Sequence, residues 1–454
     1  MGITHDLQTA LSGPSESSAA VDSLEQTWAR LLELCSGPAA LFTFPRRSFP
    51  APDMPSFVQS AVRSHGATKV HVDSLSFTGP VNAHGAGLSA FEADVPAIAE
   101  ALERYCSLIY SEHHFTTAMA LDLGNECLDL DTVATVSATE AAHPKCPIKK
   151  PSQLDSIRWV RGVSLTEGRP IYIPAVMVYS RLQAQLPGER FWLPISTGCA
   201  AHTTLDQAIR SGLFEVAERD ALSLTWLQKL PLPQIIIDQV SEELNPYLKS
   251  YERSSVDMEF RFYDATTDIG IPAVYGIRLA PARLAAYTAV ACSAASTISR
   301  AIAKVMRDLV SIGQNFEQPR KIPESLDDFT QMLHGATYMA RSEHAHAFDF
   351  LLNNGKRVSL RECEDRVADM NSLPRILASF RKKGFSVLAV DLTTAEARKV
   401  GMIVVRVIVP ALQPLSFNYT AQYKGHTRLY AAPIAMGYKA YNEENLNQWP
   451  QPFA

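Results

Sequence analysis

The sequence of 454 residues lacks the apolar run of about 18 residues that a membrane-spanning helix requires. Its first 26 residues are polar and contain no apolar core of a secretory signal peptide. A basic excess is also missing, since 42 Lys and Arg stand against 47 Asp and Glu, giving a net charge of −5. Such a balance is not typical of proteins that bind nucleic acid. These absences predict a cytoplasmic protein that binds neither a membrane nor a nucleic acid.

Two kinds of chemical site are missing as well. The seven cysteines form no CxxC pair and are odd in number, so neither a structural zinc site nor a disulfide framework is predicted. Reduced thiols fit the cytoplasm. The phosphate-binding pattern GxxxxGK followed by Ser or Thr is absent, which excludes a P-loop. The remaining composition, with 46% hydrophobic and 20% charged residues, is that of an ordinary globular protein.

Strand-like and helix-like segments alternate along the chain, which predicts an α/β or mixed α+β fold. We predict an N-terminal arm or cap over 1–55, a body over 56–440 and a tail over 441–454. Helices are predicted over 92–109, within 194–230 and over 299–314. Strands are predicted over 68–82, in a hairpin within 158–180 that turns at Glu167-Gly168, and over 259–264, 272–279, 386–394 and 402–410. The last 30 residues are predicted to be loop-like.

One local pattern occurs on two of the predicted helices. Each carries acids at positions i and i+3 and an arginine at i+4, after a polar loop that contains glycine. The residues are Glu100, Glu103 and Arg104 in the first helix, and Glu215, Glu218 and Arg219 in the second. At this spacing the three side chains share one helix face. A single copy is most often a solvated surface stripe, so the repetition is what indicates a site.

If the two helices face each other, four carboxylates come together and repel unless hard cations lie between them. Mg²⁺ is the natural cation, because it prefers oxygen ligands and shares its coordination with phosphates. The forked arginine side chains suit phosphate oxygens. The sequence therefore indicates a Mg²⁺–nucleotide site between pseudo-symmetric strand–loop–helix halves.

The residues around both motifs resemble the YcaO family. The segments GAGLS and AIAEALERY are similar to its first nucleotide-binding segment, and STGCAAHTTLDQAIRSGLFEVAERDAL is similar to its second. Within the family, RWVRGVSLTEGRPIYIPAVMVY, VDLTTAEARKVGMIVVRVIVP, RLYAAP and LNQWPQPFA resemble the D-type subunit of streptolysin-type, azoline-forming cyclodehydratases. The resemblance covers most of the chain and implies a YcaO-type fold with ATP and Mg²⁺ as cofactors.

The resemblance also implies which residues form the site. It places five acids on Mg²⁺ and within the nucleotide site: Glu100, Glu103, Glu215, Glu218 and Asp308. The nucleotide-binding set further includes Arg104, Ser196, Thr197, Gln207, Arg219 and Lys304. Gln207 stands where the family often has Glu, and Thr197 replaces a common Asn.

A third segment in the family carries an arginine and, four residues later, an acid. Two registers fit the segment AIAKVMRDLVS and its flank: Lys304 with Asp308, or Arg300 with Lys304. The first register is preferred, because the surrounding Ala/Ile pattern matches it better. Asp308 is one methylene shorter than the Glu of the family, so metal geometry there is expected to differ.

The tail sequence WPQPFA contains alternating prolines, which favour an extended polyproline II conformation. The cyclodehydratases that it resembles end in alternating prolines, and in them the tail enters the active site. The resemblance therefore implies catalytic roles for Pro450, Pro452 and Ala454, in shaping the cyclisation site or moving protons. A frayed tail is the alternative.

The implied function is ATP-dependent cyclodehydration of Cys, Ser or Thr in a ribosomally made precursor peptide to thiazoline or oxazoline. The implied partners are that peptide, an E1-like leader-binding protein and an FMN-dependent dehydrogenase, and a homodimer is also compatible with the sequence. Two alternatives stay open. The first is a YcaO enzyme that makes a thioamide or an amidine, and the second is a degenerate, non-catalytic scaffold subunit.

Other polar side chains are interpreted as lying outside the site. We expect His113 and His114, and likewise His344 and His346, to be solvated surface residues. Cys199 precedes the second motif helix, but nothing in the sequence pairs it with a base, so we interpret it as a small packed thiol.

Overall fold

The computed structural model describes residues 23–65, 81–255, 257–281, 286–315, 321–367 and 370–453. The first 22 residues of the predicted arm, most of the strand predicted over 68–82, and Ala454 lie outside the described residues.

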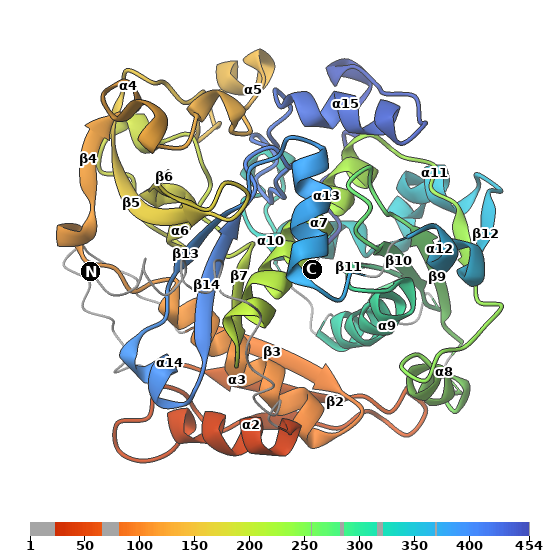
Figure 1. The fold of residues 1–454 in the computed structure, drawn as a ribbon. Helices are drawn as coiled ribbons and strands as arrows, with labels where there is room; N and C mark the ends of the chain where they lie inside the picture. The colour runs from red at the N-terminus through yellow and green to blue at the C-terminus, as the bar shows by residue number, and fades with distance from the viewer. Residues whose placement is uncertain are drawn as a thin grey trace.

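The described strands form three sheets (Figure 1). Sheet A is antiparallel with the order β1-β2-β3, made of β1 (Arg46–Ser48), β2 (Val58–Arg63) and β3 (Asn82–Gly87). Sheet B has the order β11-β10-β9-β8-β12, made of β8 (Gln234–Ile236), β9 (Glu259–Asp264), β10 (Ala273–Leu279), β11 (Thr288–Ala294) and β12 (Arg357–Ser359). Sheet C has the order β4-β5-β13-β14-β7, with β6 paired to β5. Its strands are β4 (Thr116–Met119), β5 (Ser156–Ser164), β6 (Arg169–Pro174), β7 (Cys199–His202), β13 (Leu388–Asp391) and β14 (Ile403–Ile408).

Three helices each contact two sheets: α3 (Ala90–Cys106), α7 (Leu205–Leu227) and α9 (Ile298–Asn315). Helix α10 (Met332–Met339) contacts β11 of sheet B. Helix α7 packs against β14 and β7 of sheet C and against β11 and β10 of sheet B, so it lies between two sheets. A helix covered in this way buries most of its surface, and the sequence of α7 is accordingly apolar on several sides. Helix α3 covers sheet A and reaches β7, whereas α9 packs on β10 and β11 and contacts β3.

The other helices lie around this frame. They are α2 (Leu24–Leu31), α4 (Ala120–Leu123), α5 (Ala138–Ala142), α6 (Ala175–Val178), α8 (Asn245–Glu252), α11 (Asp349–Leu352), α12 (Leu360–Arg366), α13 (Leu373–Lys382), α14 (Ala395–Lys399) and α15 (Thr427–Ala435). No helix in the described ranges is both long and apolar enough to cross a membrane.

Helices α3 and α7 begin in the same way. The hydroxyl of Ser89 accepts a hydrogen bond from the backbone N–H of Glu92, and the hydroxyl of Thr204 accepts one from that of Gln207. Each helix follows a strand, β3 or β7, and equivalent residues such as Ser89 and Thr204 are 115 positions apart. The predicted mixed fold with two similar strand–loop–helix units is therefore confirmed.

Most predicted elements are confirmed, with shifted ends. The hairpin of β5 and β6 turns at Gly168, whose φ of 71° lies in the left-handed region that favours glycine. The prediction of a loop-like last segment is wrong for α15. The helix forms because Leu429 and Ala432 are buried in the core that includes α7.

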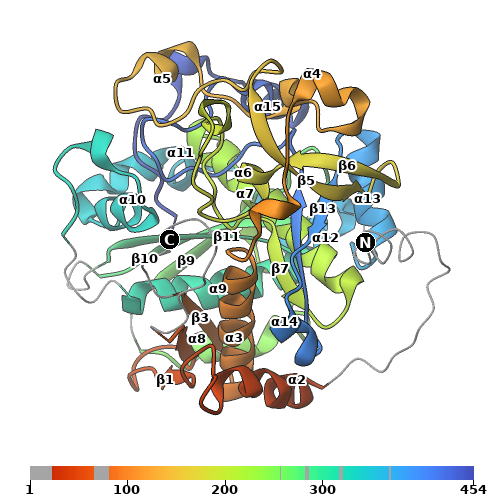
Figure 2. The ribbon, with the colours of Figure 1, turned by 90° about the vertical axis from the view of Figure 1, so that its left-hand side faces the viewer.

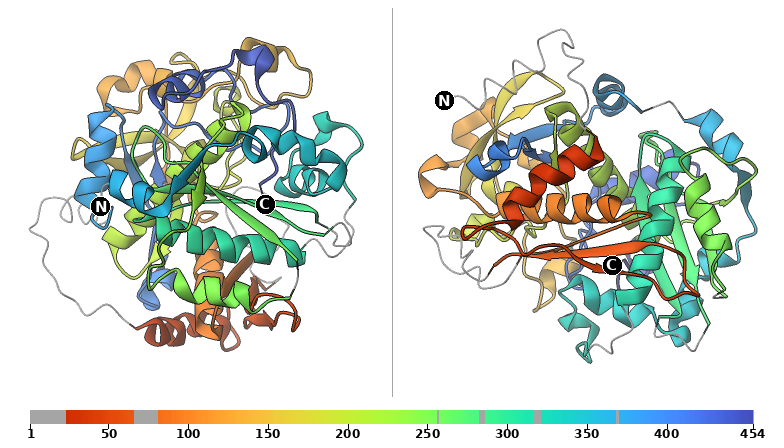
Figure 3. Two further views of the ribbon diagram at one scale, coloured as in Figure 1. Left: turned by 90° about the vertical axis from the view of Figure 1, so that its right-hand side faces the viewer. Right: turned by 90° about the horizontal axis from the view of Figure 1, so that it is seen from below.

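Sheet A joins two segments that the sequence analysis assigned to different units. Strand β1 lies in the predicted arm, yet it pairs with β2 of the predicted body, with Arg46 opposite Ala61. Sheet A, α2 and α3 lie together at one end of the molecule (Figure 2, and Figure 3 from below). Residues 46–48 therefore belong structurally with the body.

Candidate active site

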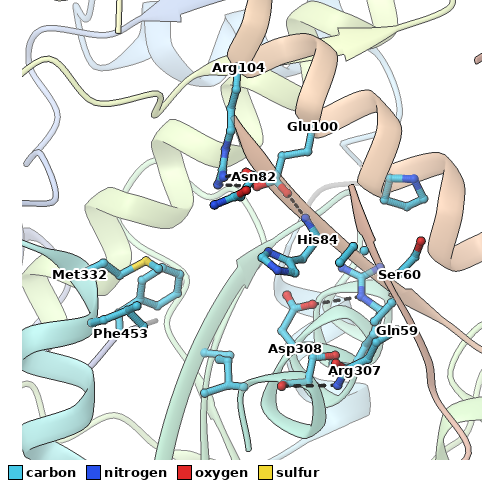
Figure 4. Close-up of a pocket in the computed structure, with 18 of the residues that line it drawn as sticks. Gln59, Ser60, Asn82, His84, Glu100, Arg104, Arg307, Asp308, Met332 and Phe453 are labelled. Atoms are coloured by element: carbon cyan, nitrogen blue, oxygen red, sulfur yellow. Dashed lines mark hydrogen bonds and ion pairs between the residues drawn. The ribbon is translucent and has the colours of Figure 1, made fainter. Parts of the chain in front are cut away.

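A cavity of about 700 Å³ lies where sheet A, α3, α7, β11, α9 and α10 meet (Figure 4). Its polar lining includes Arg46, Ser48, Gln59, Asn82, His84, Glu100, Arg104, Glu218, Arg219, Arg307, Asp308 and Ser311. Its apolar lining includes Pro96, Ile312, Met332, Leu333 and Phe453. The cavity is therefore rich in both acids and guanidinium groups, with apolar side chains beside them.

Glu100 and Arg104 of the first motif line one wall of this cavity, whereas Glu103 lies outside the lining (Figure 4). Glu100 pairs with Arg104 at 2.7 Å and accepts a hydrogen bond of 2.8 Å from the backbone N–H of His84. Arg104 also donates to the backbone carbonyl of Asn82. Helix α3 is thus fastened to β3 by the same side chains that face the cavity.

The second motif repeats this arrangement on α7. Glu215 accepts a hydrogen bond of 2.9 Å from the N–H of Gly198 and lies 3.3 Å from Arg219. Glu218 lies 3.2 Å from Nη1 of Arg219, and its second oxygen accepts a hydrogen bond from the N–H of Ala294. Glu218 and Arg219 line the cavity, whereas Glu215 lies outside the lining and holds Arg219.

The two motifs lie close enough for their carboxylates to influence each other. Burial raises the pKa of Glu103 well above its usual range, and the nearby charges of Glu215 and Glu100 raise it further. Burial also raises the pKa of Glu218, although Arg219 and Lys304 beside it act in the opposite direction. The charges of Glu100 and Glu215 thus act on Glu103, and the charge of Glu215 acts on Glu218, so the two motifs influence each other electrostatically.

These residues fit a divalent cation by their chemistry. Carboxylate oxygens are the ligands that Mg²⁺ prefers, and a cation would relieve the repulsion that raises the pKa of Glu103. Among the described residues, no group of three or more His, Cys, Asp or Glu side chains is arranged so that it could hold a metal ion. The metal set predicted from the sequence therefore stays a prediction.

Helix α9 supplies the wall opposite α3. Asp308 lines the cavity and pairs with Arg307 at 3.0 Å (Figure 4). Lys304 is close enough to Glu218 to lower its pKa. In the alternative register, Arg300 would have to face the site, but it lies 3.7 Å from Glu243 and is exposed.

Six predicted nucleotide-binding residues lie outside the lining of the cavity: Glu103, Ser196, Thr197, Gln207, Glu215 and Lys304. Ser196 and Thr197 belong to the loop that precedes β7. Gln207 belongs to the N-terminal cap of α7, where its side-chain oxygen accepts a hydrogen bond of 2.9 Å from the Thr204 hydroxyl. Their contact with a nucleotide stays a prediction.

The C-terminal tail runs inward, so its described part is not frayed. Pro450 and Pro452 are buried, and the carbonyl of Trp449 accepts a hydrogen bond from the indole of Trp226. Phe453 pairs with Val290 of β11 in a parallel bridge. Its ring lines the cavity, 4.4 Å from the guanidinium carbon of Arg219.

The residues of sheet A and Arg307 were missed by the sequence analysis. Residues 59–63 and 82–86 alternate between the two faces of their strands, and this alternation could have indicated which side chains share a face. It identifies the cavity face only when the pairing of β2 with β3 is known. Arg307 falls outside the four-residue spacing of positions 300, 304 and 308, on which both registers of α9 rest. Its neighbour Asp308 was the available signal.

Three sets of side chains interpreted as lying outside the site are placed by the structure. His344 is buried, which corrects the expected surface position. Its ring stacks on Tyr338 and lies 5.3 Å from the ring of Trp449, so the tail covers it. Cys199 is a packed thiol as expected, and burial raises its pKa to about 12. His113 and His114 are exposed as expected.

Comparisons with known proteins agree with this geometry. The family model described as YcaO cyclodehydratase, ATP- and Mg²⁺-binding, matches residues 84–413. A heterocyclase solved in complex with substrate and cofactor is similar with a TM-score of 0.78 and 21% identity, over 98% of this chain and 60% of that chain. The chain thus spans less than two thirds of that protein.

Two other solved structures share the fold. YcaO from Methanopyrus kandleri, bound with AMPPCP and Mg²⁺, has a TM-score of 0.58 and 19% identity over 86% of this chain and 90% of its own. A chain of the E. coli microcin synthetase McbBCD complex has a TM-score of 0.54 and 18% identity over 81% of this chain and 88% of its own.

Proposed function

Because the chain belongs to the YcaO cyclodehydratase family, we propose that it uses ATP and Mg²⁺ to cyclise Cys, Ser or Thr residues of a ribosomally made peptide. The observation that carries this proposal is the meeting of both motifs and the tail at one cavity. Glu100 and Arg104 enter it from α3, Glu218 and Arg219 from α7, and Phe453 from the tail.

The proposed reaction has three steps. The side-chain thiol or hydroxyl of the peptide gives up its proton as its sulfur or oxygen bonds to the preceding backbone carbonyl carbon, which closes the ring and moves the carbonyl π electrons onto oxygen. That oxygen then takes the γ-phosphoryl group from ATP, releasing ADP. The C–O bond breaks as phosphate leaves with the oxygen, the amide nitrogen gives up its proton, and the C=N bond of the azoline forms. An amide oxygen is a poor leaving group, and phosphorylation makes it a good one.

The residues of the cavity act mainly by positioning and by balancing charge. Arg104 and Arg219 present forked donors to phosphate oxygens. Glu100, Glu103, Glu215, Glu218 and Asp308 are the proposed metal ligands. Mg²⁺, when bound, neutralises phosphate charge.

The tail completes the site in this proposal. Pro450 and Pro452 would keep the terminal segment extended, with Phe453 against Arg219. The role proposed for Ala454 in the same cyclisation site concerns a residue outside the described part of the chain. The burial of Pro450 and Pro452 supports this role. Because proline restricts the backbone, the tail loses little conformational entropy when it is held in one position. The tail would shape the space in which the ring closes and exclude water from it.

We also propose that the chain works within a multi-protein synthetase. An E1-like protein would bind the leader of the precursor peptide, and an FMN-dependent dehydrogenase would oxidise azoline to azole. Support comes from the similarity to a chain of the microcin synthetase McbBCD complex.

The test is mass spectrometry of the cognate precursor peptide after incubation with the protein, its neighbouring partner proteins, ATP and Mg²⁺. Loss of one water per ring that requires ATP is the expected result. Exchange of oxygen for sulfur would instead identify a thioamide-forming enzyme. An unchanged peptide, with folded and bound partners, would favour a non-catalytic scaffold and overturn the proposal.

A further inference from the structure

One wall of the cavity is the open face of sheet A, which lies largely outside the segment matched by the family model. The register places Arg46 of β1 opposite Ala61 of β2, and Ala61 opposite His84 of β3. All three residues line the cavity. Since the family model begins at residue 84, the arginine of this row comes from a part of the chain to which the family pattern assigns no role.

The position of Arg46 is fixed by its neighbour on the opposite face. Successive side chains of a strand point to opposite faces, so Arg47 points toward α3 when Arg46 points toward the cavity. Arg47 pairs with the fully buried Asp94 at 2.5 Å, and Asp94 also accepts hydrogen bonds from Ser60 and from the indole of Trp28. This anchor prevents β1 from slipping by one residue, which would exchange the two arginines.

The anchor is strongly ionised. Burial alone would raise the pKa of Asp94, but the hydrogen bonds from Arg47, Ser60 and Trp28 outweigh it and hold the pKa below its usual range. A carboxylate that is charged at neutral pH keeps Arg47, and with it the strand, in place.

Arg46 differs from the other guanidinium groups of the cavity in its partners. Arg104, Arg219 and Arg307 each have a carboxylate oxygen within 3.3 Å. In the part of the chain that the structure describes, Arg46 has no ion pair with a carboxylate. A guanidinium without a carboxylate partner binds an entering oxyanion without first giving up an existing ion pair.

We propose that Arg46 binds the phosphate groups of the nucleotide in this cavity. The proposal rests on the nucleotide-dependent function proposed above and adds to it a phosphate-binding residue from the N-terminal segment. The forked side chain at the rim contacts anionic oxygens, whereas the apolar residues Ile312, Met332 and Leu333 are suited to the uncharged part of the nucleotide.

The experiment compares Arg46→Met with the wild-type protein by calorimetric titration of Mg²⁺-AMPPCP and, separately, of adenosine. Arg63→Met is the matched control, because Arg63 shares the face of β2 with Gln59 and Ala61 but lies outside the cavity lining. We expect Arg46→Met to lower the affinity for AMPPCP about tenfold, as for the loss of a charge-assisted hydrogen bond. We expect unchanged adenosine affinity, partial recovery in Arg46→Lys, and no change in Arg63→Met.

The possible results separate this inference from the proposed function. Equal AMPPCP affinity in Arg46→Met and wild type overturns the role of Arg46, even if the wild type cyclises the peptide. A raised KM for the peptide with unchanged AMPPCP affinity also overturns it, because Arg46 would then bind the peptide. Wild-type protein that binds AMPPCP through Arg46 but leaves the peptide unmodified contradicts the proposed function alone. A wild type that does not bind AMPPCP overturns both.

Discussion

The two motif helices share one pattern of contacts but differ in their surroundings. In both, the first glutamate accepts a backbone N–H from a neighbouring segment and pairs with the arginine four residues later. The side chains of Glu100 and Arg104 are 34% and 39% exposed, whereas those of their counterparts Glu215 and Arg219 are 26% and 16% exposed. The second glutamate of α7, Glu218, is 10% exposed. Helix α7 lies between two sheets, and α3 covers a sheet at one end of the molecule.

This difference shows that the repeated sequence determines the local geometry of the motif, whereas the surrounding packing determines its electrostatic environment. An ion pair that is shielded from water interacts more strongly, and its loss is more costly, than one that water can replace. We therefore expect the α7 motif to tolerate substitution much less than the α3 motif.

The largest effect is expected from Glu218→Gln. The substitution removes a buried charge that balances Arg219 and accepts a hydrogen bond from Ala294. Peptide-dependent ATP turnover should fall about 100-fold or more, as for other preorganised charged groups. Glu126→Gln, at an exposed position outside the cavity, is the control. Undiminished turnover in a folded Glu218→Gln protein would contradict the assignment of the α7 motif.

Glu100→Gln should have a smaller effect in the same assay. Because the Glu100–Arg104 pair is partly hydrated, water compensates for part of the lost charge, and turnover should fall about tenfold. If Glu100→Gln lowers peptide-dependent ATP turnover as much as Glu218→Gln does, then side-chain exposure does not determine how sensitive each motif is to substitution.

Phe453→Leu tests the contact between the tail and the α7 motif. The change keeps an apolar side chain but removes the ring that faces Arg219. A cation–π contact of about 1 kcal/mol corresponds to about a fivefold loss in kcat/KM for the peptide. Phe49→Leu, at a position that is 72% exposed, should leave kcat/KM unchanged. Equal losses in both variants would show that the ring over Arg219 is irrelevant.

The smallest effect concerns pH and Mg²⁺. A carboxyl group whose pKa is higher in the folded than in the unfolded protein makes the fold less stable as pH rises between the two values. The raised pKa values of Glu103 and Glu218 therefore predict that Mg²⁺ stabilises the protein more at neutral pH than at acidic pH.

Thermal unfolding with and without Mg²⁺ at several pH values measures this effect, and the expected difference is about 2 °C. Glu103→Gln should raise the unfolding temperature in the absence of Mg²⁺ and reduce the gain from adding it. A Mg²⁺ effect that is independent of pH would argue against carboxylate ligands with raised pKa values.

The sequence was sufficient for the parts of the site that depend on helix periodicity. The spacing of Glu100, Glu103 and Arg104 placed these side chains together, because positions i, i+3 and i+4 share a face in any α-helix. Asp308, which the family resemblance and not the periodicity assigned, lines the cavity from α9.

The remaining parts depend on contacts between distant segments. The position of Arg46 follows from the register of β1 on β2 and from Asp94, which lies 48 residues further along the chain. The burial of His344 depends on Trp449 in the tail. Local patterns carry no information on such pairings, so neither could be predicted from the sequence.

The seating of Trp449 has a practical consequence. Its indole lies between His344 and His346, and its carbonyl is bound by Trp226, so its environment changes when the tail leaves the cavity. Tryptophan emission depends on the polarity around the indole. The chain contains five tryptophans, so the difference in emission between the wild type and Trp449→Phe isolates the fluorophore that reports tail displacement during turnover, with Trp226 still in place.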